Sequence, residues 1–219
     1  MTLILATITR QCAVLAVDCR VIGTSKKTGE RLLLSDTEQK IAAYADVAVA
    51  HQGAQSVDGQ SVTLVTQAWL EQHYSAEADF QDQISALSAY LEERAPGVGL
   101  VAIHRNAAVT ELLRLVEEPE YKVLRPQDTA RMTISGTGSH LVQSLLEASH
   151  IKLGDLGPLR LAKFSAWLIN AVHNLLTVEH GGLISVGPDV SVVMLAESGI
   201  KYTVIKPSEL DLELEKPVG

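Results

Sequence analysis

The first eighteen residues contain two consecutive β-rich runs that are apolar on both faces. Residues 2–9, TLILATIT, and residues 12–18, CAVLAVD, are separated only by Arg10-Gln11. Alternate side chains of a strand point to opposite faces of a sheet, so strands that are apolar on both faces must be covered on both sides. This hairpin therefore requires a layered fold in which it is an inner element.

The remaining elements follow from changes in the hydrophobic period. Residues 23–31 are polar with two glycines and are expected to form an exposed loop or hairpin tip, and a second hairpin is expected around Ala45-Asp46. Apolar residues at three- and four-residue spacing then predict two helices before Pro96-Gly97 and two more in the second half of the chain. The residues with this spacing are Val62, Val65, Trp69, Phe80, Ile84, Leu87 and Leu91 in the first pair and Leu141, Leu145, Leu146, Leu161, Phe164, Leu168, Val172 and Leu175 in the second.

Further strand-like runs complete the order of elements. They occupy residues 99–104, 107–115 and 131–135, with a final hairpin at 190–196 and 201–205. Hairpin-like connections favour antiparallel pairing. The order predicts an α+β fold, a four-layer αββα sandwich of two mostly antiparallel sheets between helical layers. No repeat, low-complexity segment or long linker divides the chain, so residues 1–219 are expected to form a single domain.

Charge and composition exclude two classes of partner. The 18 Lys and Arg residues against 26 Asp and Glu residues give a net charge of −8, which repels a phosphate backbone, so nucleic acid is not expected as a partner. No charge-free run reaches the roughly 18 apolar residues of a membrane helix, so no membrane span is expected.

The first residues lack a basic leader and soon meet Arg10 and Asp18, which predicts a cytoplasmic protein. Cys12 and Cys19 lie too far apart along one strand for a disulfide and are expected to be reduced thiols.

Thr2 is a candidate nucleophile. Removal of Met1 leaves a threonine whose hydroxyl and free α-amine belong to one residue. The ordinary pKa of an α-amine is roughly 7.7 to 8.0, so this group can take the hydroxyl proton directly or through water. Met-Thr also begins very many proteins, so the pair by itself is equally consistent with an ordinary chain start.

Asp18 makes the assignment more specific. A three-residue loop at 9–11 sets Asp18 opposite Thr2, and a two-residue loop shifts it by one place; either register puts the carboxylate about 5 to 8 Å from Thr2. A carboxylate in an apolar strand is costly unless it is paired, and Arg20 and Lys40 are the candidate partners. The alternative is an Asp at the strand end that faces water.

Together these residues carry a resemblance to a known family. Thr2 followed by a β-run, then AVDCR at residues 16–20, then Gln39-Lys40-Ile41 before the second hairpin, resembles proteasome β subunits and their bacterial relatives among the N-terminal nucleophile hydrolases. The likeness covers most of the chain, including the order of strands and helices.

The resemblance implies a role for each residue of the cluster. Thr2 would be the nucleophile, and Lys40 the cation that lowers the proton affinity of the site. Asp18 would keep Lys40 charged and oriented, and Arg20 would support the strand beside them.

A later segment, ISGTGSH at residues 134–140, resembles the family's glycine-rich serine loop beside the nucleophile. By that resemblance, Thr137 would supply a hydroxyl near the α-amine of Thr2. The residues alone also allow a tight turn that needs glycine at positive φ, or a phosphate cradle at a helix N-terminus, for which the Walker lysine is absent.

The chain departs from the family at several positions. The stretch between Asp18 and Lys40 is several residues longer than usual. His51 stands where the family usually has a glycine whose backbone N–H serves the oxyanion hole, and its side chain is expected to narrow the pocket. By the resemblance, Val49 and Val21 would also belong to the substrate-binding surface.

A second departure lies near the end of the chain. The segment TVEHGG at residues 177–182 resembles an Asp-x-x-Ser-Gly-Gly signature in which Thr177 replaces the Asp and His180 the Ser. In the family these two polar groups support the α-amine, so weaker or differently tuned activity is expected.

The resemblance implies a threonine peptidase that cleaves peptide bonds inside a self-compartmentalising assembly of stacked homo-oligomeric rings, seven-fold in preference to six-fold. Its partners would be other copies of itself and unfolded polypeptide, with an ATPase partner left open. No cofactor is expected, and the seven histidines show no spacing typical of a metal site. Two alternatives remain: an amidohydrolase of the same fold that acts on a small amide, and a catalytically silent ring scaffold.

Overall fold

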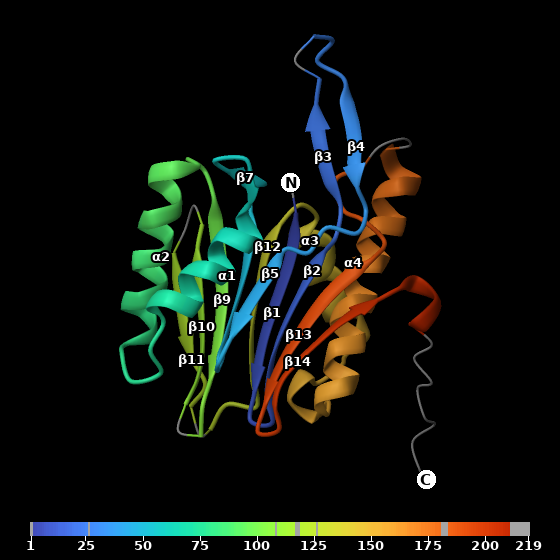
Figure 1. The fold of residues 1–219 in the computed structure, drawn as a ribbon. Coiled ribbons are helices and arrows are strands. Elements are labelled where there is room, and N and C mark those ends of the chain that lie inside the picture. The colour runs from blue at the N-terminus through green and yellow to red at the C-terminus, as the bar shows by residue number, and fades with distance from the viewer. Residues whose placement is uncertain are drawn as a thin grey trace.

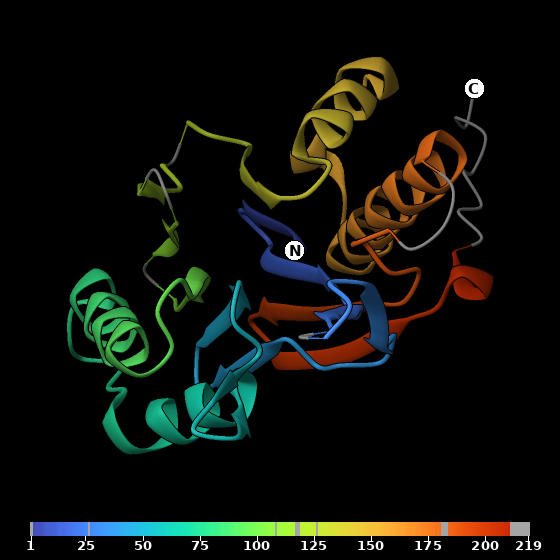
Figure 2. The same cartoon turned by 90° about the horizontal axis from the view of Figure 1, so that it is seen from above.

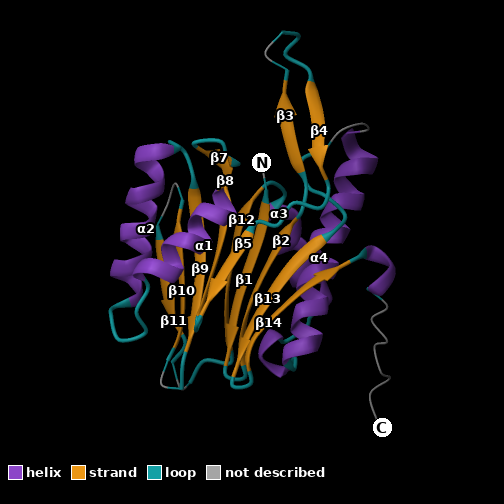
Figure 3. Ribbon diagram, in the orientation of Figure 1, coloured by secondary structure: helices purple, strands orange, loops and turns teal. Residues whose placement is uncertain are grey.

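Two five-stranded antiparallel sheets form the centre of the molecule (Figures 1 and 3). The computed structural model describes residues 2–25, 27–107, 109–116, 119–125, 127–180 and 184–210. In the first sheet the strand order is β12 (Ala130–Gly136), β1 (Leu3–Thr9), β2 (Cys12–Asp18), β13 (Val190–Ala196) and β14 (Gly199–Ile205). In the second sheet it is β11 (Glu120–Val123), β10 (Thr110–Leu115), β9 (Gly99–Arg105), β6 (Val47–Gln52) and β5 (Ile41–Tyr44). The mixed α+β class and the antiparallel pairing are confirmed.

Two helices lie on the outer face of each sheet, so that the sheets are enclosed by helices on both sides (Figure 2). The second sheet is covered by α1 (Val62–His73) and α2 (Phe80–Arg94), and the first sheet by α3 (Ser139–Ser149) and α4 (Pro158–His180). Short 3₁₀ helices occur at Leu153–Asp155 and Pro207–Glu209. No helix in the described ranges is both long enough and apolar enough to cross a membrane.

The alternation of side chains along β1 explains the layering. Leu3 and Leu5 pack with α3 and α4 on the outer face of the first sheet. Ile4, Ala6 and Ile8 point the other way and pack against the second sheet. Every residue of β1 is buried, as is every residue of β2. The expectation that this hairpin is covered on both sides is confirmed, because each face of the strands contributes to a different apolar layer.

The loop of the first hairpin has two residues, which is the second of the two registers that the sequence allowed. Ile4 lies opposite Val17, which leaves Arg10-Gln11 as the turn. The main chain of Leu3 therefore lies beside Asp18, and the N–H of Leu3 donates a hydrogen bond to the Asp18 carboxylate.

Five short strands were not predicted from the sequence. The polar segment predicted as a loop or tip belongs to a hairpin of β3 (Val21–Thr24) and β4 (Arg31–Ser35), which projects from the body in Figure 1. The two-residue strands β7 (Ser56–Val57) and β8 (Gln60–Ser61) are too short to show a period, and β11 carries mostly polar residues. The first paired strands, the second hairpin, the four helices and the final hairpin lie where the hydrophobic periods predicted them.

Candidate functional site

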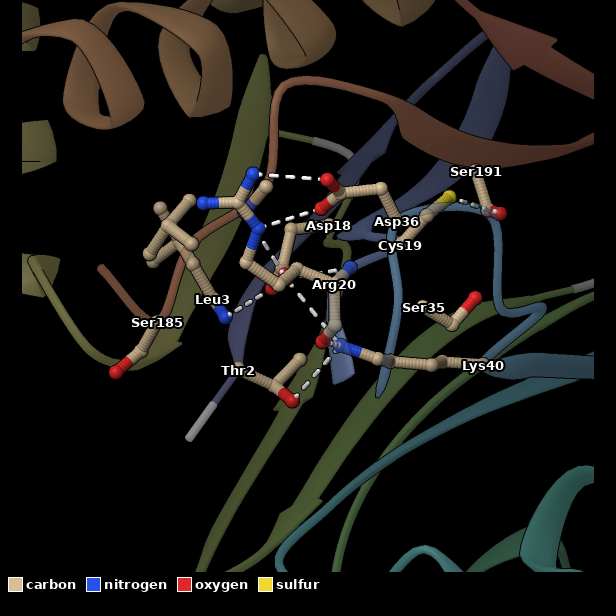
Figure 4. A network of polar contacts seen from close by, with 12 residues as sticks. Thr2, Leu3, Asp18, Cys19, Arg20, Ser35, Asp36, Lys40, Ser185 and Ser191 are labelled. Carbon is tan, nitrogen blue, oxygen red and sulfur yellow. Dashed lines mark hydrogen bonds and ion pairs between the residues drawn. The ribbon is translucent and has the colours of Figure 1, made fainter. Parts of the chain in front are cut away.

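Thr2, Asp18 and Lys40 come together at the ends of their strands (Figure 4). The Nζ of Lys40 donates to Thr2 Oγ1 at 3.2 Å, to Asp18 Oδ2 at 3.2 Å and to the carbonyl oxygen of Arg20 at 2.5 Å. An ammonium group has three donors, so all three are used and the orientation of Lys40 is fixed. The side chains of Lys40 and Asp18 are both 0% exposed, and such a buried pair stays stable only while it remains matched.

Asp18 also accepts hydrogen bonds from the main chain of three segments. The N–H groups of Leu3, Arg20 and Gly187 donate to it at 2.7, 3.1 and 3.4 Å. Burial raises the pKa of Asp18, and the charge of Lys40 together with these N–H donors opposes that rise. The carboxylate is therefore a fixed part of the strand ends and does not face water.

The side chain of Arg20 pairs with Asp36, and not with Asp18 as the sequence allowed. Its guanidinium pairs with Asp36, Nε to Oδ1 at 2.5 Å and Nη2 to Oδ2 at 3.0 Å, and Nη1 reaches the carbonyl oxygen of Ile184 at 3.4 Å. Of the two candidate cations, Lys40 is the one whose side chain pairs with Asp18. Arg20 contributes its carbonyl oxygen to the Lys40 ammonium and ties the start of the β3–β4 hairpin to the segment before β13.

The glycine loop closes over Thr2. Gly136 has φ +98°, and a Cβ there would lie 1.7 Å from the carbonyl oxygen of Thr2, so only glycine fits. The N–H of Thr137 donates to that same carbonyl oxygen at 3.1 Å. The Thr137 hydroxyl is buried and has no hydrogen-bond partner among the described residues. The loop therefore holds an unused polar group beside Thr2, and the tight glycine turn that the sequence allowed is also present.

A cavity of about 1150 Å³ lies beside these residues. It runs from the start of β1 and the end of β12 to α2 and the end of β10. Thr2 lines one part of it, and the residues that line it with Thr2 include Gln52, Ser88, Arg114, Gly136 and Thr137. This volume is slightly above the usual range of about 300 to 1,000 Å³ for a small-molecule pocket, so the cavity has room for an organic ligand or a stretch of peptide.

The structure corrects the expected positions of His51 and Val49. Alternation along β6 turns both side chains toward the helices, where Val49 belongs to the apolar layer with α1 and α2 and the Nε2 of His51 lies 3.1 Å from the Thr63 hydroxyl. The His51 side chain therefore does not narrow the cavity. Its backbone N–H, expected to serve an oxyanion, donates to the carbonyl oxygen of Lys40 at 3.3 Å. Val21 is buried at the base of the β3–β4 hairpin and does not line the cavity.

His51 is also unsuitable as a base for Thr2. Burial, reinforced by the charge of Lys40, lowers the pKa of His51 to about 3, so the ring is too weak a base to hold a proton taken from Thr2 at physiological pH. The Thr63 hydroxyl donates to the carbonyl oxygen of Gln39 at 2.6 Å, which leaves Thr63 Oγ1 to accept from the His51 ring. Lys40, as an ammonium, has no lone pair with which to accept a proton.

The structure does not bring Thr177 to the site. Its hydroxyl donates to the carbonyl oxygen of His173, one turn earlier in α4, at 2.8 Å, and the residue is exposed. A threonine hydroxyl bonds readily to its own helix, and this bond leaves no donor for the α-amine. His180 ends α4, but its side chain lies outside the described part of the structure, as do Gly181 and Gly182.

Three polar residues around the site and its cavity were not predicted from the sequence. Asp36 holds Arg20, Gln52 accepts from the Ser135 hydroxyl at 3.1 Å at the edge of the cavity, and Arg114 lines the cavity farther from Thr2. The alternation of β6 was a usable signal for Gln52, because Ala50 and Gln52 must face away from the helices once Val49 faces them.

Among the residues described, no group of three or more His, Cys, Asp or Glu side chains is arranged to hold a metal ion. Cys12 and Cys19 are both buried free thiols, as the sequence predicted. Searches of protein-family models and of curated proteins found no match to this chain.

Proposed function

We propose that the chain is a threonine peptidase of the N-terminal nucleophile class, with the proteasome-like fold and activity that its sequence motifs resemble. One observation carries the proposal: the Thr2 hydroxyl is hydrogen-bonded to a fully buried Lys40 ammonium that Asp18 holds in place, at the wall of a cavity. A buried ammonium directed at a hydroxyl stabilises the oxygen as it gains negative charge during attack.

The reaction requires that the peptide bond between Met1 and Thr2 is first cleaved. Thr2 Oγ1 then attacks the carbonyl carbon of the substrate amide, and its proton passes to the freed α-amine. The tetrahedral intermediate collapses when the α-ammonium returns that proton to the leaving amine, which breaks the C–N bond and leaves an ester on Thr2. Water, deprotonated by the same α-amine, hydrolyses this ester and restores the hydroxyl.

Thr137 supports this use of the α-amine. Its buried hydroxyl has no partner among the described residues, and its N–H already binds the carbonyl oxygen of Thr2. An unpaired buried hydroxyl is costly, and an α-ammonium on Thr2 would supply the missing donor.

The proposal extends to assembly. By the same resemblance, copies of the chain form stacked homo-oligomeric rings around a chamber that admits unfolded polypeptide, with an ATPase as a further candidate partner. Three consecutive leucines, Leu32, Leu33 and Leu34, are 47 to 65% exposed on β4, and apolar surface of this kind is typical of protein that contacts another protein.

An electrophilic probe tests the chemistry directly. Protein whose chains begin at Thr2 is treated with a β-lactone or epoxyketone and weighed as intact protein, with Thr2→Ala and chains that retain Met1 as controls. We expect one adduct per chain at Thr2 and none in either control, because one lacks the nucleophile and the other lacks the basic amine. Equal labelling of chains with and without Met1 would show that the α-amine is not the base.

The silent ring scaffold remains the rival function, because Thr177 bonds to its own helix and the N–H of His51 is used within the sheet. An absence of both labelling and peptide hydrolysis in chains beginning at Thr2 would favour it.

A further inference from the structure

Arg114 occupies an unusual position in the second sheet. In β10, Leu112 faces the first sheet and belongs to the apolar layer between the two sheets, whereas Leu113 faces the helices. Arg114 follows by alternation on the same face as Leu112, directly opposite Val101 of that layer. The Arg114 guanidinium therefore lies on a face of β10 whose other residues belong to the core. At this end of the strand, that face lines the cavity.

This guanidinium forms no ion pair with the residues that the structure describes, although its charge, against the effect of burial and after the hydrogen bonds from Thr133 and Lys122, contributes to lowering the pKa of Glu120 on the neighbouring strand. Its Nε is buried and without a hydrogen-bond partner, and no hydrogen bond or ion pair of the side chain is found within those residues. A guanidinium has five N–H donors and stays charged in proteins, so leaving it unpaired in a partly buried position costs free energy that an anion would recover.

The nearby carboxylates are used elsewhere. Glu120, opposite Arg114 on β11, accepts from the Thr133 hydroxyl at 2.8 Å and pairs with Lys122 at 3.0 Å. Glu92 lines the same cavity from α2, but its Oε2 accepts from the N–H of Gly97 at 2.9 Å. Both carboxylates thus have donors of their own, and Arg114 lines the cavity that Thr2 also lines without a hydrogen bond to either of them.

We propose that Arg114 binds a carboxylate of the substrate, so that the cavity prefers an acidic peptide whose Glu or Asp side chain lies some distance from the bond presented to Thr2. A guanidinium matches a carboxylate with two parallel N–H donors, which gives both affinity and orientation. This inference rests on the proposed function for the cleavage step, whereas the binding itself does not depend on hydrolysis.

The test uses pairs of acetylated and amidated hexapeptides that differ only by Glu or Gln at one position, with the position scanned along the peptide. Calorimetric binding is measured with Thr2→Ala protein, which cannot turn the peptide over. We expect one Glu position to bind about tenfold or more tightly than its Gln counterpart, as is typical of a hydrogen-bonded charge pair. Adding Arg114→Gln should remove this preference, and adding Arg114→Glu should shift it to a third peptide that carries Lys at the same position.

Two control variants accompany the series. Arg125→Gln removes the same charge from an exposed position after β11 and should leave the preference unchanged. Glu117→Gln with Glu118→Gln removes the two carboxylates that follow β10 in the sequence and should keep or increase it. Urea unfolding of each variant shows that it is folded.

The outcomes separate the two proposals. Equal affinity for Glu and Gln peptides at every position, or no binding of any peptide, overturns the role of Arg114 even if Thr2 is labelled by the electrophile. A preference that depends on Arg114 together with an unlabelled Thr2 overturns the peptidase and leaves a binding site for acidic peptides.

Discussion

Lys40 is a fully buried lysine whose ammonium meets three acceptors, one at the start of β1 and two at or just after the end of β2. Thr2 Oγ1, Asp18 Oδ2 and the carbonyl oxygen of Arg20 take its three protons, and no water is required to satisfy it. Removing either Lys40 or Asp18 leaves the charge of the other buried and unpaired, so Lys40 contributes to stability as well as to the proposed chemistry.

Lys40→Met tests this double role. We expect the free energy of unfolding to fall by about 3 to 5 kcal/mol, because the Asp18 carboxylate is left buried without its counter-ion. The double variant Lys40→Met with Asp18→Asn should recover part of that loss, since the uncompensated charge is gone and the N–H donors keep an acceptor. Urea unfolding measures both variants. Labelling of Thr2 should be lost in each, and labelling of the double variant at the wild-type rate would exclude a role for Lys40 in activating Thr2.

Gly136→Ala tests the glycine loop at the same scale. The added Cβ would meet the carbonyl oxygen of Thr2 at 1.7 Å, so we expect Thr2 to be displaced and its labelling by the electrophile to be lost. Gly29→Ala is the matched control, since Gly29 also has positive φ but nothing lies within 4 Å of its added Cβ. The control should cost only about 1 to 2 kcal/mol from the backbone conformation and leave labelling intact. Similar labelling of the two variants would mean that the loop does not position Thr2.

At the scale of elements, the sequence predicted where strands and helices lie better than which way their side chains point. The β1–β2 hairpin was predictable because both faces of its strands carry apolar residues and the turn is short. The cost of an unpaired carboxylate predicted a cation beside Asp18 but left Arg20 and Lys40 as candidates, and only the resemblance favoured Lys40. The direction of the His51 side chain follows from the alternation of side chains along β6. The resemblance concerned only the backbone N–H of His51 and did not indicate this direction. The Arg20–Asp36 pair was not predictable, since it depends on how the β3–β4 hairpin leaves the sheet.

A polar cluster ties together five elements at the far end of the second sheet. His104 on β9 lies with Nδ1 2.7 Å from Glu111 and Nε2 3.1 Å from Asp46, and Tyr74 donates to the same Asp46 at 2.7 Å. Tyr121 of β11 donates to Glu111. Burial alone would lower the pKa of His104, but the two carboxylates outweigh it and raise that pKa.

The raised pKa of His104 predicts a pH-dependent stability. The protonated ring is favoured in the folded state, so its contribution is fully present below the ordinary pKa of roughly 6.5 and is lost as the pH rises through the raised value. We expect the difference in unfolding free energy between wild type and His104→Gln to shrink from about pH 6 to pH 9. Urea unfolding across this range measures it, and a difference that stays constant would place a neutral ring between the carboxylates.

For the whole molecule, the ring proposal predicts a large homo-oligomer. The exposed apolar residues lie on several elements and include Leu32, Leu33 and Leu34 on β4 and Leu159, Leu175 and Val178 on α4. Burying such surface between copies is the usual way to remove it from water. Sedimentation velocity should show a particle of many 23.6 kDa chains, and a monomer or simple dimer at micromolar concentration would contradict the rings.

The position of β1 inside the first sheet has a consequence for biosynthesis. β1 pairs on one side with β2, which follows at once, and on the other with β12, whose last residue, Gly136, emerges more than half a chain later. At about 5 to 20 residues per second, the start of β1 waits on the order of ten seconds before its second neighbour exists. On the mechanism proposed above, this interval is the time in which Met1 can be removed while Thr2 is uncovered, because docking of β12 brings Gly136 and Thr137 against the carbonyl oxygen of Thr2. Faster translation or earlier docking would therefore leave more chains with an unprocessed start, so the yield of competent protein would depend on the kinetics of its own synthesis.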